Sequence, residues 1–109
     1  MATTYKVLGQ SAPSATTATT LYTVPSATET VVSTIVIANR AASAGSYRIA
    51  IRPDGATLAN EHYLAYDVAI AANDSTALTL GITINASDVI TVYASSADMS
   101  FTAFGSEIS

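Results

Sequence analysis

The sequence has no cysteine, no tryptophan and a single histidine among its 109 residues. Without cysteine there is neither a disulfide framework nor a thiolate metal site, so folding in a reducing cytoplasm is the simplest expectation. We expect no secretory signal, because residues 1–6 contain no apolar stretch. No apolar run approaches the roughly 20 residues of a membrane-spanning helix, and no basic amphipathic stretch indicates binding to a membrane surface.

Charged residues are also scarce. Four Lys and Arg stand against eight Asp and Glu, which gives a net charge of −4. We therefore expect no nucleic-acid binding, because phosphate contacts need clustered Lys and Arg. Half of the residues are apolar, enough for one domain spanning residues 1–109 to build a core. A surface this poor in charge is typical of a protein that packs against copies of itself or against a partner.

Alternating apolar residues and turn residues predict about eight short strands and no helix. The expected strands are Tyr5–Leu8, Thr20–Val24, Thr30–Ala38, Tyr47–Arg52, His62–Ile70, Leu78–Ile84, Val89–Ala94 and Met99–Phe104. Short strands separated by regular turns indicate an all-β fold. We expect an antiparallel two-sheet β-sandwich, either Ig-like or jelly-roll-like, since the strand topology cannot be derived from the pattern.

Several of these strands predict which side chains form the core. The expected inward faces are Tyr47, Ile49 and Ile51; Leu64, Tyr66, Val68 and Ile70; and Leu78, Leu80, Ile82 and Ile84. The strand over residues 30–38 differs because it is apolar on both alternating sets of positions. Such a pattern is typical of a central strand with both faces covered.

Residues 9–20 contain no large apolar side chain and cannot contribute to a core. Two interpretations remain open for this segment. It is either a surface loop that joins two strands or a flexible arm that reaches a partner, because long loops in small domains are often functional. Fully extended, such an arm spans about 40 Å.

The residue types that commonly carry out catalysis are not spaced for it in this sequence. His62 follows Glu61, but neighbours in a strand point to opposite faces, so Glu61 is badly placed to orient the imidazole. The aspartates at residues 54, 74, 88 and 98 fall at turns, where hydrogen bonds to the backbone explain them. Glycine-rich phosphate motifs and calcium-loop spacings are absent. We therefore predict that the chain is not an enzyme and has no catalytic residue, metal site or cofactor.

Five residues are candidates for a protein interface: Arg40, Arg48, Arg52, Tyr63 and Tyr93. Arg48 and Arg52 share one face of a predicted strand, with Arg40 just upstream, and arginine is enriched in interfaces. The alternative for the arginines is a solvated outer face. Tyr63 and Tyr93 are expected to be exposed, and exposed tyrosines make good contacts. A carbohydrate platform is the other interpretation of the tyrosines, although such platforms usually recruit tryptophan.

Five segments resemble small virion structural proteins of tailed bacteriophages, especially those of cyanobacterial and other aquatic hosts. They are Leu21–Asn39, Tyr47–Pro53, His62–Asp67, Asp88–Ala94 and Phe104–Ser109. The resemblance extends over nearly the whole chain from Tyr5. These are motifs of fold and packing, so no functional residue is carried over from the family.

The resemblance implies a non-enzymatic structural subunit of a tailed-phage virion, most consistent with decorating or cementing the capsid exterior. A tail or baseplate accessory subunit, or a tail-borne receptor or glycan-binding module, is the alternative. The expected partners are copies of the chain itself, as a homo-oligomer, and the major capsid or tail proteins. The expected location is the virion, after assembly in the host cytoplasm.

Overall fold

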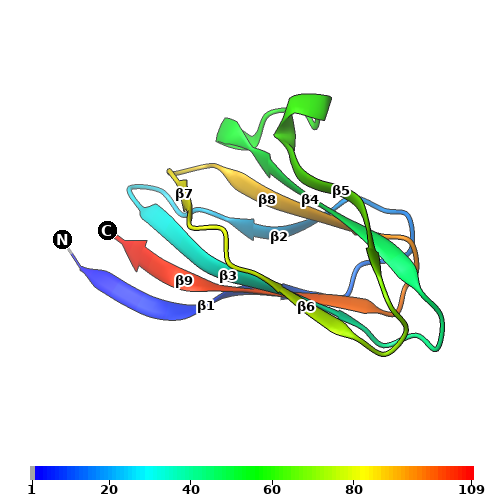
Figure 1. The fold of residues 1–109 in the computed structure, drawn as a ribbon. Coiled ribbons are helices and arrows are strands. Elements are labelled where there is room, and N and C mark those ends of the chain that lie inside the picture. Colours follow the sequence, from blue (N-terminus) through cyan, green and yellow to red (C-terminus); the bar gives the residue numbers. More distant parts are fainter. Residues whose placement is uncertain (1) are drawn as a thin grey trace.

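The computed structural model describes residues 2–109, which form two antiparallel sheets packed face to face (Figure 1). The first sheet has the order β1–β9–β3–β6, with β7 pairing the other half of β3. Its strands are β1 (Thr3–Ser11), β3 (Glu29–Asn39), β6 (Ser75–Leu78), β7 (Ile82–Ile84) and β9 (Met99–Ile108). The second sheet has the order β2–β8–β4–β5. Its strands are β2 (Thr19–Thr23), β4 (Gly45–Arg52), β5 (Tyr63–Ile70) and β8 (Val89–Ala94). The two-sheet β-sandwich predicted from the sequence is confirmed.

The strand pairing follows one regular scheme. When β6 and β7 are counted as one interrupted strand, the first strand pairs with the last and the second with the last but one. Likewise β3 pairs with β6 and β7, and β4 pairs with β5. This is the pairing of a jelly roll, in which one long hairpin bends over so that successive pairs fall in opposite sheets. The structure thus decides between the two architectures that the sequence left open.

The core lies between the two sheets and is centred on β3, β4, β8 and β9. Tyr47 and Phe101 meet edge to face across it, with ring centroids 6.4 Å apart. Both are at most 1% exposed, and Ile49 is fully buried beside them. The inward face predicted for β4 is therefore confirmed at Tyr47 and Ile49, whereas Ile51 is only partly buried.

The inward face predicted for β5 is wrong except at its last residue. Leu64, Tyr66 and Val68 are 50%, 56% and 39% exposed, and only Ile70 is buried. At Leu64 and Tyr66 the alternation fails because β5 changes register twice against β4. Val68 pairs directly with the inward-facing Tyr47 and keeps the inward parity, and it is exposed because β5 is an edge strand. Asp67 also takes a left-handed φ of 52°. Each bulge advances the strand by one residue and turns the following side chains to the other face.

The strand predicted over residues 78–84 is interrupted. β6 ends at Leu78 and β7 begins at Ile82, and Gly81 between them has a φ of 62° that favours glycine. Leu80 falls in this break and is 49% exposed, while Ile84 is buried as predicted. The break accounts for nine strands where the sequence predicts about eight.

The connection between β1 and β2 is shorter than the segment of residues 9–20 predicted from the sequence. Residues 9–11 complete β1 and residues 19–20 begin β2, so that residues 12–18 alone join the two strands. Within this connection the Thr16 N–H donates to the Ala94 carbonyl at 2.8 Å. The small residues of the segment suit strand ends that approach each other closely at the edge of the sandwich.

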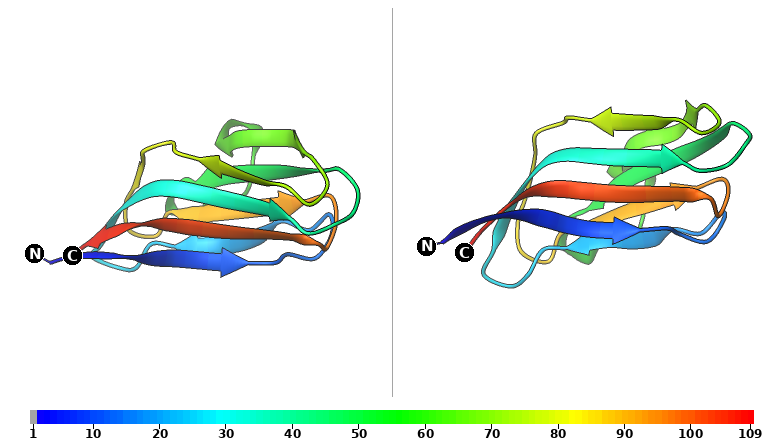
Figure 2. Two further views of the ribbon diagram at one scale, coloured as in Figure 1. Left: turned by 60° about the horizontal axis from the view of Figure 1, so that its bottom comes forward. Right: turned by 90° about the horizontal axis from the view of Figure 1, so that it is seen from below.

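The central position predicted for residues 30–38 is confirmed, because β3 lies between β9 on one side and β6 and β7 on the other. Its inward residues, such as Ile35 and Ile37, are fully buried. The outward residues Val31 and Val36 are only partly buried. Seen from below, the strands of the first sheet lie side by side and no other described segment crosses in front of them (Figure 2). The prediction that both faces of β3 are covered is therefore wrong, because the described chain leaves the outward face with Val31 and Val36 open.

Candidate protein interface

The guanidinium group of Arg48 lies between two tyrosine rings on the outer face of the second sheet. Its Cζ atom is 4.1 Å from the ring centroid of Tyr66 and 4.1 Å from that of Tyr93. The Nε–H donates to Oδ1 of Asp67 at 2.7 Å. This hydrogen bond raises the pKa of Arg48, so the group stays a cation. A cation held between two π faces and a carboxylate has a fixed geometry, which suits contact with a partner.

Strand pairing brings these side chains together. Arg48 of β4 and Tyr93 of β8 are direct cross-strand partners, which places both on the same face. Tyr66 and Asp67 belong to β5, which changes register opposite Arg48. The left-handed backbone at Asp67 lets the neighbouring ring and carboxylate both turn toward the guanidinium.

Tyr63 extends the aromatic surface along β5. Its ring meets that of Tyr66 at an interplanar angle of 85°, with the centroids 4.9 Å apart. Beside them lies a hollow of about 390 Å³ lined by Asn60, Tyr63 and Tyr66. We name the group of five residues on this face the arginine–tyrosine cluster: Arg48, Tyr63, Tyr66, Asp67 and Tyr93.

Four of the five predicted interface residues lie on this side of the second sheet: Arg48, Arg52, Tyr63 and Tyr93. Arg52 is anchored to its surroundings, with Nε donating to Thr91 Oγ1 at 3.0 Å and Nη1 to the Ala56 carbonyl at 3.1 Å. Arg40 stands apart in the loop between β3 and β4, where Nη2 donates to the Ala97 carbonyl at 3.3 Å. The structure therefore groups four of the candidates and separates Arg40.

Sequence reasoning missed two members of the cluster. Strict alternation placed Tyr66 in the core, and Asp67 carried no signal of a partner. The register shift of β5 opposite Arg48 turned Tyr66 to the outer face, on which alternation already placed Asp67. A bulge depends on how β5 meets β4, so the period-2 pattern of β5 by itself contains no trace of it.

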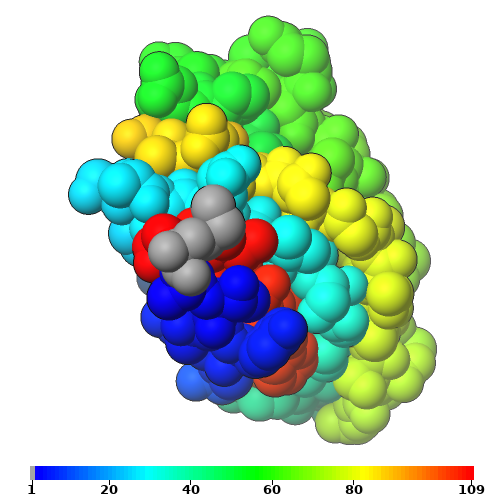
Figure 3. All heavy atoms as spheres, turned by 90° about the vertical axis from the view of Figure 1, so that its left-hand side faces the viewer, coloured from blue at the N-terminus to red at the C-terminus, as the bar shows by residue number. Residues whose placement is uncertain are grey.

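A second exposed apolar group lies on the outer face of the first sheet. Tyr5 is 84% exposed, Val7 is 46% exposed and Phe104 is 38% exposed. Val7 of β1 and Phe104 of β9 are direct cross-strand partners, so their side chains lie next to each other. In Figure 3 β1 (blue) lies at the surface next to β9 (orange to red), with β3 (cyan) beside them. Sequence reasoning treated β1 only as a short first strand and did not identify this surface.

A hollow of about 480 Å³ opens on the same face, next to Tyr5. Gly105 and Ser106 of β9 contribute its smallest lining residues, Val31 belongs to β3, and Phe104 lies beside them. Small residues in β9 between larger ones on both neighbouring strands account for the depression. We name it the β1–β9–β3 hollow, and its full lining is Tyr5, Lys6, Val31, Ser33, Phe104, Gly105 and Ser106.

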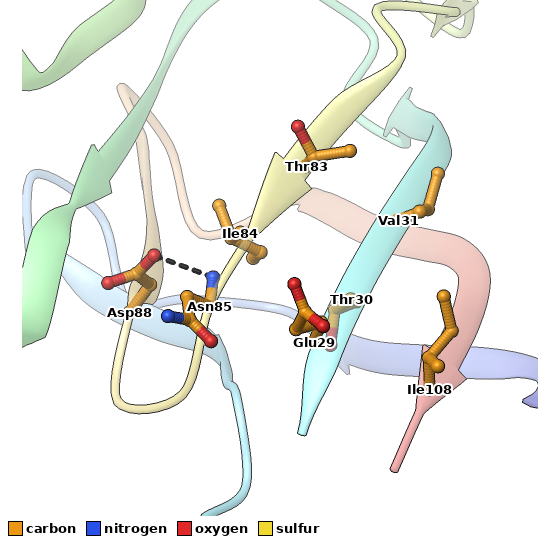
Figure 4. Close-up of a pocket in the computed structure, with 8 residues that line it drawn as sticks. All are labelled: Glu29, Thr30, Val31, Thr83, Ile84, Asn85, Asp88 and Ile108. Atoms are coloured by element: carbon orange, nitrogen blue, oxygen red, sulfur yellow. Dashed lines mark hydrogen bonds between the residues drawn. The ribbon is translucent and has the colours of Figure 1, made fainter. Parts of the chain in front are cut away.

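A third cavity, of about 420 Å³, lies where β3 and β7 meet the turn before β8 (Figure 4). Two carboxylates line it, those of Glu29 and Asp88. The Asp88 carboxylate accepts two backbone hydrogen bonds. Oδ2 accepts the Asn85 N–H and Oδ1 accepts the Asp54 N–H, each at 2.8 Å. Residues 2–109 hold no group of three or more His, Cys, Asp or Glu side chains that could bind a metal ion. The cavity thus contains a turn-stabilising aspartate and one further carboxylate.

His62 has a local structural role. Its Nδ1 atom accepts the Ala59 N–H at 3.0 Å, which closes the short 3-10 turn η2 (Asn60–His62). Nδ1, the ring nitrogen that an orienting carboxylate would bind in a catalytic triad, is in this way committed to the backbone of its own turn. Glu61 next to it is exposed.

A buried polar network joins the two sheets near the chain ends. The Tyr22 hydroxyl of β2 donates to Glu107 of β9 and lies 2.8 Å from Thr30 Oγ1 of β3. Lys6 Nζ is 3.2 Å from Glu107 Oε1. Burial and the hydrogen bond to Glu107 raise the pKa of Tyr22 to about 12. The hydrogen bond from Tyr22 lowers the pKa of Glu107, with Lys6 adding to the effect against the opposing influence of burial.

No protein-family model, curated protein or solved structure matches the chain. Within residues 2–109 no helix is long and apolar enough to cross a membrane. The functional interpretation therefore depends on the surfaces described above and on the sequence resemblance.

Proposed function

We propose that the chain is a non-enzymatic structural subunit of a tailed-phage virion, and that it decorates or cements the capsid exterior. Its partners are further copies of itself and the major capsid protein, and it binds the particle without a cofactor. The observation that carries this proposal is the exposure of large apolar side chains on both sheets. Tyr5 and Phe104 are exposed on the first sheet, and Leu64 and Tyr66 on the second.

Two apolar surfaces on opposite sides of a small sandwich suit a subunit with two sets of neighbours. Extended exposed apolar patches are uncommon on soluble monomers and mark interaction sites. A lattice subunit needs one surface for its own kind and another for the lattice, whereas a simple binder needs only one. The jelly roll supports the proposal as an analogy, because it is a frequent architecture of viral coat domains.

Electron microscopy of purified phage particles tests the location. We expect a gold-labelled antibody against the chain to mark the capsid at regular spacing. Label confined to the tail would overturn the capsid location in favour of the tail or baseplate accessory subunit. Particles without any label, although they contain the expected coat proteins, would overturn the virion role altogether.

Two leucines offer a matched test of the surface that contacts the lattice. Leu64 is 50% exposed in β5 directly after Tyr63, a member of the arginine–tyrosine cluster, and Leu80 is 49% exposed between β6 and β7. Leu64→Ser is expected to reduce binding to particles that lack the subunit at least tenfold, and Leu80→Ser less than twofold. Equal losses for both variants would contradict a lattice contact through the arginine–tyrosine cluster.

A second candidate, a tail-borne glycan-binding module, is favoured by the hollow lined by Asn60, Tyr63 and Tyr66. Aromatic rings with one polar side chain are a common lining for a small ligand. If this candidate is correct, the chain binds host-surface glycans on an array and Tyr63→Ala abolishes the signal, while Tyr5→Ala retains it. An array without any signal would exclude the glycan module.

A further inference from the structure

The outer face of the first sheet carries large apolar side chains among uncharged polar ones. An antiparallel strand with one face in solvent normally alternates between apolar and polar residues. β3 breaks that rule with Val31 and Val36, which point outward and are only partly buried. Neighbouring strands add Val7 and Phe104 in the same layer. These apolar side chains lie on a face that the described chain leaves uncovered.

Two cross-strand rows show how continuous this surface is. Val7 of β1, Phe104 of β9 and Thr34 of β3 form one row of paired residues. Tyr5, Ser106 and Val31 form the next row in the same strands. In the described strands of this sheet, Glu29 is the one charged residue at an outward-facing position. The surface is nearly neutral although each copy carries a net charge of −4.

A neutral contact surface favours a second copy of the chain as the occupant. Two copies with the same net charge repel each other, and they approach with least repulsion through the faces that carry least charge. The charges of the second sheet, by contrast, gather around Arg48 and Asp67 on the far side of the sandwich. Lys6 at the rim of the β1–β9–β3 hollow is paired with Glu107.

The face also holds a projecting residue and a hollow side by side. Tyr5, at 84% exposure, is the most exposed large apolar side chain of the described residues, and it forms one wall of the β1–β9–β3 hollow. When two copies meet about a two-fold axis, residue i of one contacts residue j of the other and the reverse contact follows by symmetry. A projecting ring next to a hollow lined in part by glycine and serine is self-complementary under that operation.

The size of the face is sufficient for such a pairing. The molecule measures 45 × 27 × 20 Å, and the first sheet forms one broad side of it. A stable interface buries about 800 Å² on each partner, less than the roughly 1,200 Å² outlined by the two longer dimensions. Burial of an exposed tyrosine within such a patch is a typical source of binding energy.

We propose that the outer face of the first sheet is a two-fold interface with a second copy of this chain, in which Tyr5 of each copy occupies the β1–β9–β3 hollow of the other. The inference deepens the proposed assembly role by naming its self-contact. It can be tested on the purified chain without any particle. A chain that stays monomeric would overturn the pairing and leave attachment to the particle standing.

Sedimentation velocity of the full chain measures the pairing. We expect a species of about 22 kDa, twice the mass of one copy, to appear as the concentration rises toward about 1 mM. Dilution should change the amide NMR signals of β1, β9 and β3 while those of β5 and β8 stay in place. A monomer throughout that range, or concentration-dependent signals centred on β5, would overturn the proposal.

Two tyrosine variants separate this face from the other one. Tyr5→Ser is expected to weaken the dimer at least tenfold, and Tyr66→Ser, which removes an exposed tyrosine from the second sheet, less than twofold. Ser106→Asp places a charge inside the hollow and should weaken the dimer by a similar factor without removing any ring. Circular dichroism confirms the fold of each variant. A dimer that Tyr5→Ser and Ser106→Asp leave intact would contradict the pairing.

Discussion

Phe101 and Phe104 lie three residues apart on β9 and have opposite surroundings. Phe101 is fully buried against Tyr47, whereas Phe104 is 38% exposed on the outer face of the first sheet. We expect Phe101→Ala to lower the free energy of unfolding by about 3–5 kcal/mol, since it leaves a cavity in the core. Phe104→Ala should cost less than about 1 kcal/mol in the monomer. Urea unfolding of dilute protein measures both, and similar losses would show that Phe104 is part of the core.

The carboxylate of Glu107 makes stability depend on pH. Its pKa is lowered in the folded state, chiefly by the hydrogen bond from Tyr22. A lowered folded-state pKa means that the carboxylate stabilises the fold above the ordinary glutamate pKa of about 4.3 and that this contribution is lost as the pH falls. We therefore expect the free energy of unfolding to decrease on acidification below about pH 5. The Glu107→Gln variant should be less stable at pH 7 and show a shallower acid slope.

Urea unfolding between about pH 2 and pH 7 measures this slope. Glu61→Gln is the matched control, because Glu61 is exposed on η2, and it should keep the slope of the parent protein. Tyr22→Phe removes the donor instead of the acceptor and should lower stability at pH 7 by about 1.5–3 kcal/mol. An unchanged acid slope in Glu107→Gln would show that other groups carry the pH dependence.

At the scale of the element, β9 depends on a glycine for its approach to β3. A Cβ on Gly105 would overlap the Val31 carbonyl oxygen, which is backbone and cannot rotate away. We expect Gly105→Ala to push the two strands apart and to cost about 2–4 kcal/mol. Thr102→Ala on the same strand, on the outward side of the sheet, is the control and should change stability by less than about 0.5 kcal/mol. Thermal unfolding of both variants measures the difference, and a Gly105→Ala protein of parental stability would contradict the close approach.

β5 shows how an edge strand departs from the apolar–polar alternation of its sequence. A central strand is held in register on both sides, while β5 pairs only with β4. One bulge opposite Arg48 and another between Ile49 and Ala50 interrupt the inward face of β5, and Leu64 and Tyr66 are exposed there. In exchange they bring Tyr66 and Asp67 to the guanidinium. Bulges that redirect side chains are frequent at sheet edges and binding surfaces, which agrees with the interface role proposed here.

At the scale of the whole molecule, the distribution of charge predicts how self-association responds to salt. Each copy carries a net charge of −4, while the proposed contact face is almost neutral. Salt then screens only the repulsion between copies, because the Debye length shrinks from about 30 Å at 0.01 M to about 8 Å at 0.15 M. We expect the dimer to tighten a few-fold over that range. Sedimentation at the two salt concentrations measures this, and a dimer that weakens with salt would indicate contact through charged pairs.

The sequence by itself determined the fold class and the centre of the core. The period-2 alternation around Tyr47 and Ile49 and the β-branched run of β3 predicted both correctly, because those strands are central and their neighbours on both sides preserve the pattern. Composition likewise determined that charge would be sparse on the surface. These properties depend on residues that are close together in the sequence, so the sequence alone predicts them.

Only the tertiary structure decided the topology and the surfaces. Pairing of the first strand with the last is a contact between residues a hundred positions apart, for which no local pattern exists. The same holds for the cluster around Arg48, which needs a register shift in β5, and for the exposure of Tyr5 beside Phe104, which needs β1 to lie on β9. In a regular strand the alternation decides which face a side chain occupies, but bulges that change the face, and the covering of that face, depend on what the rest of the chain places beside it.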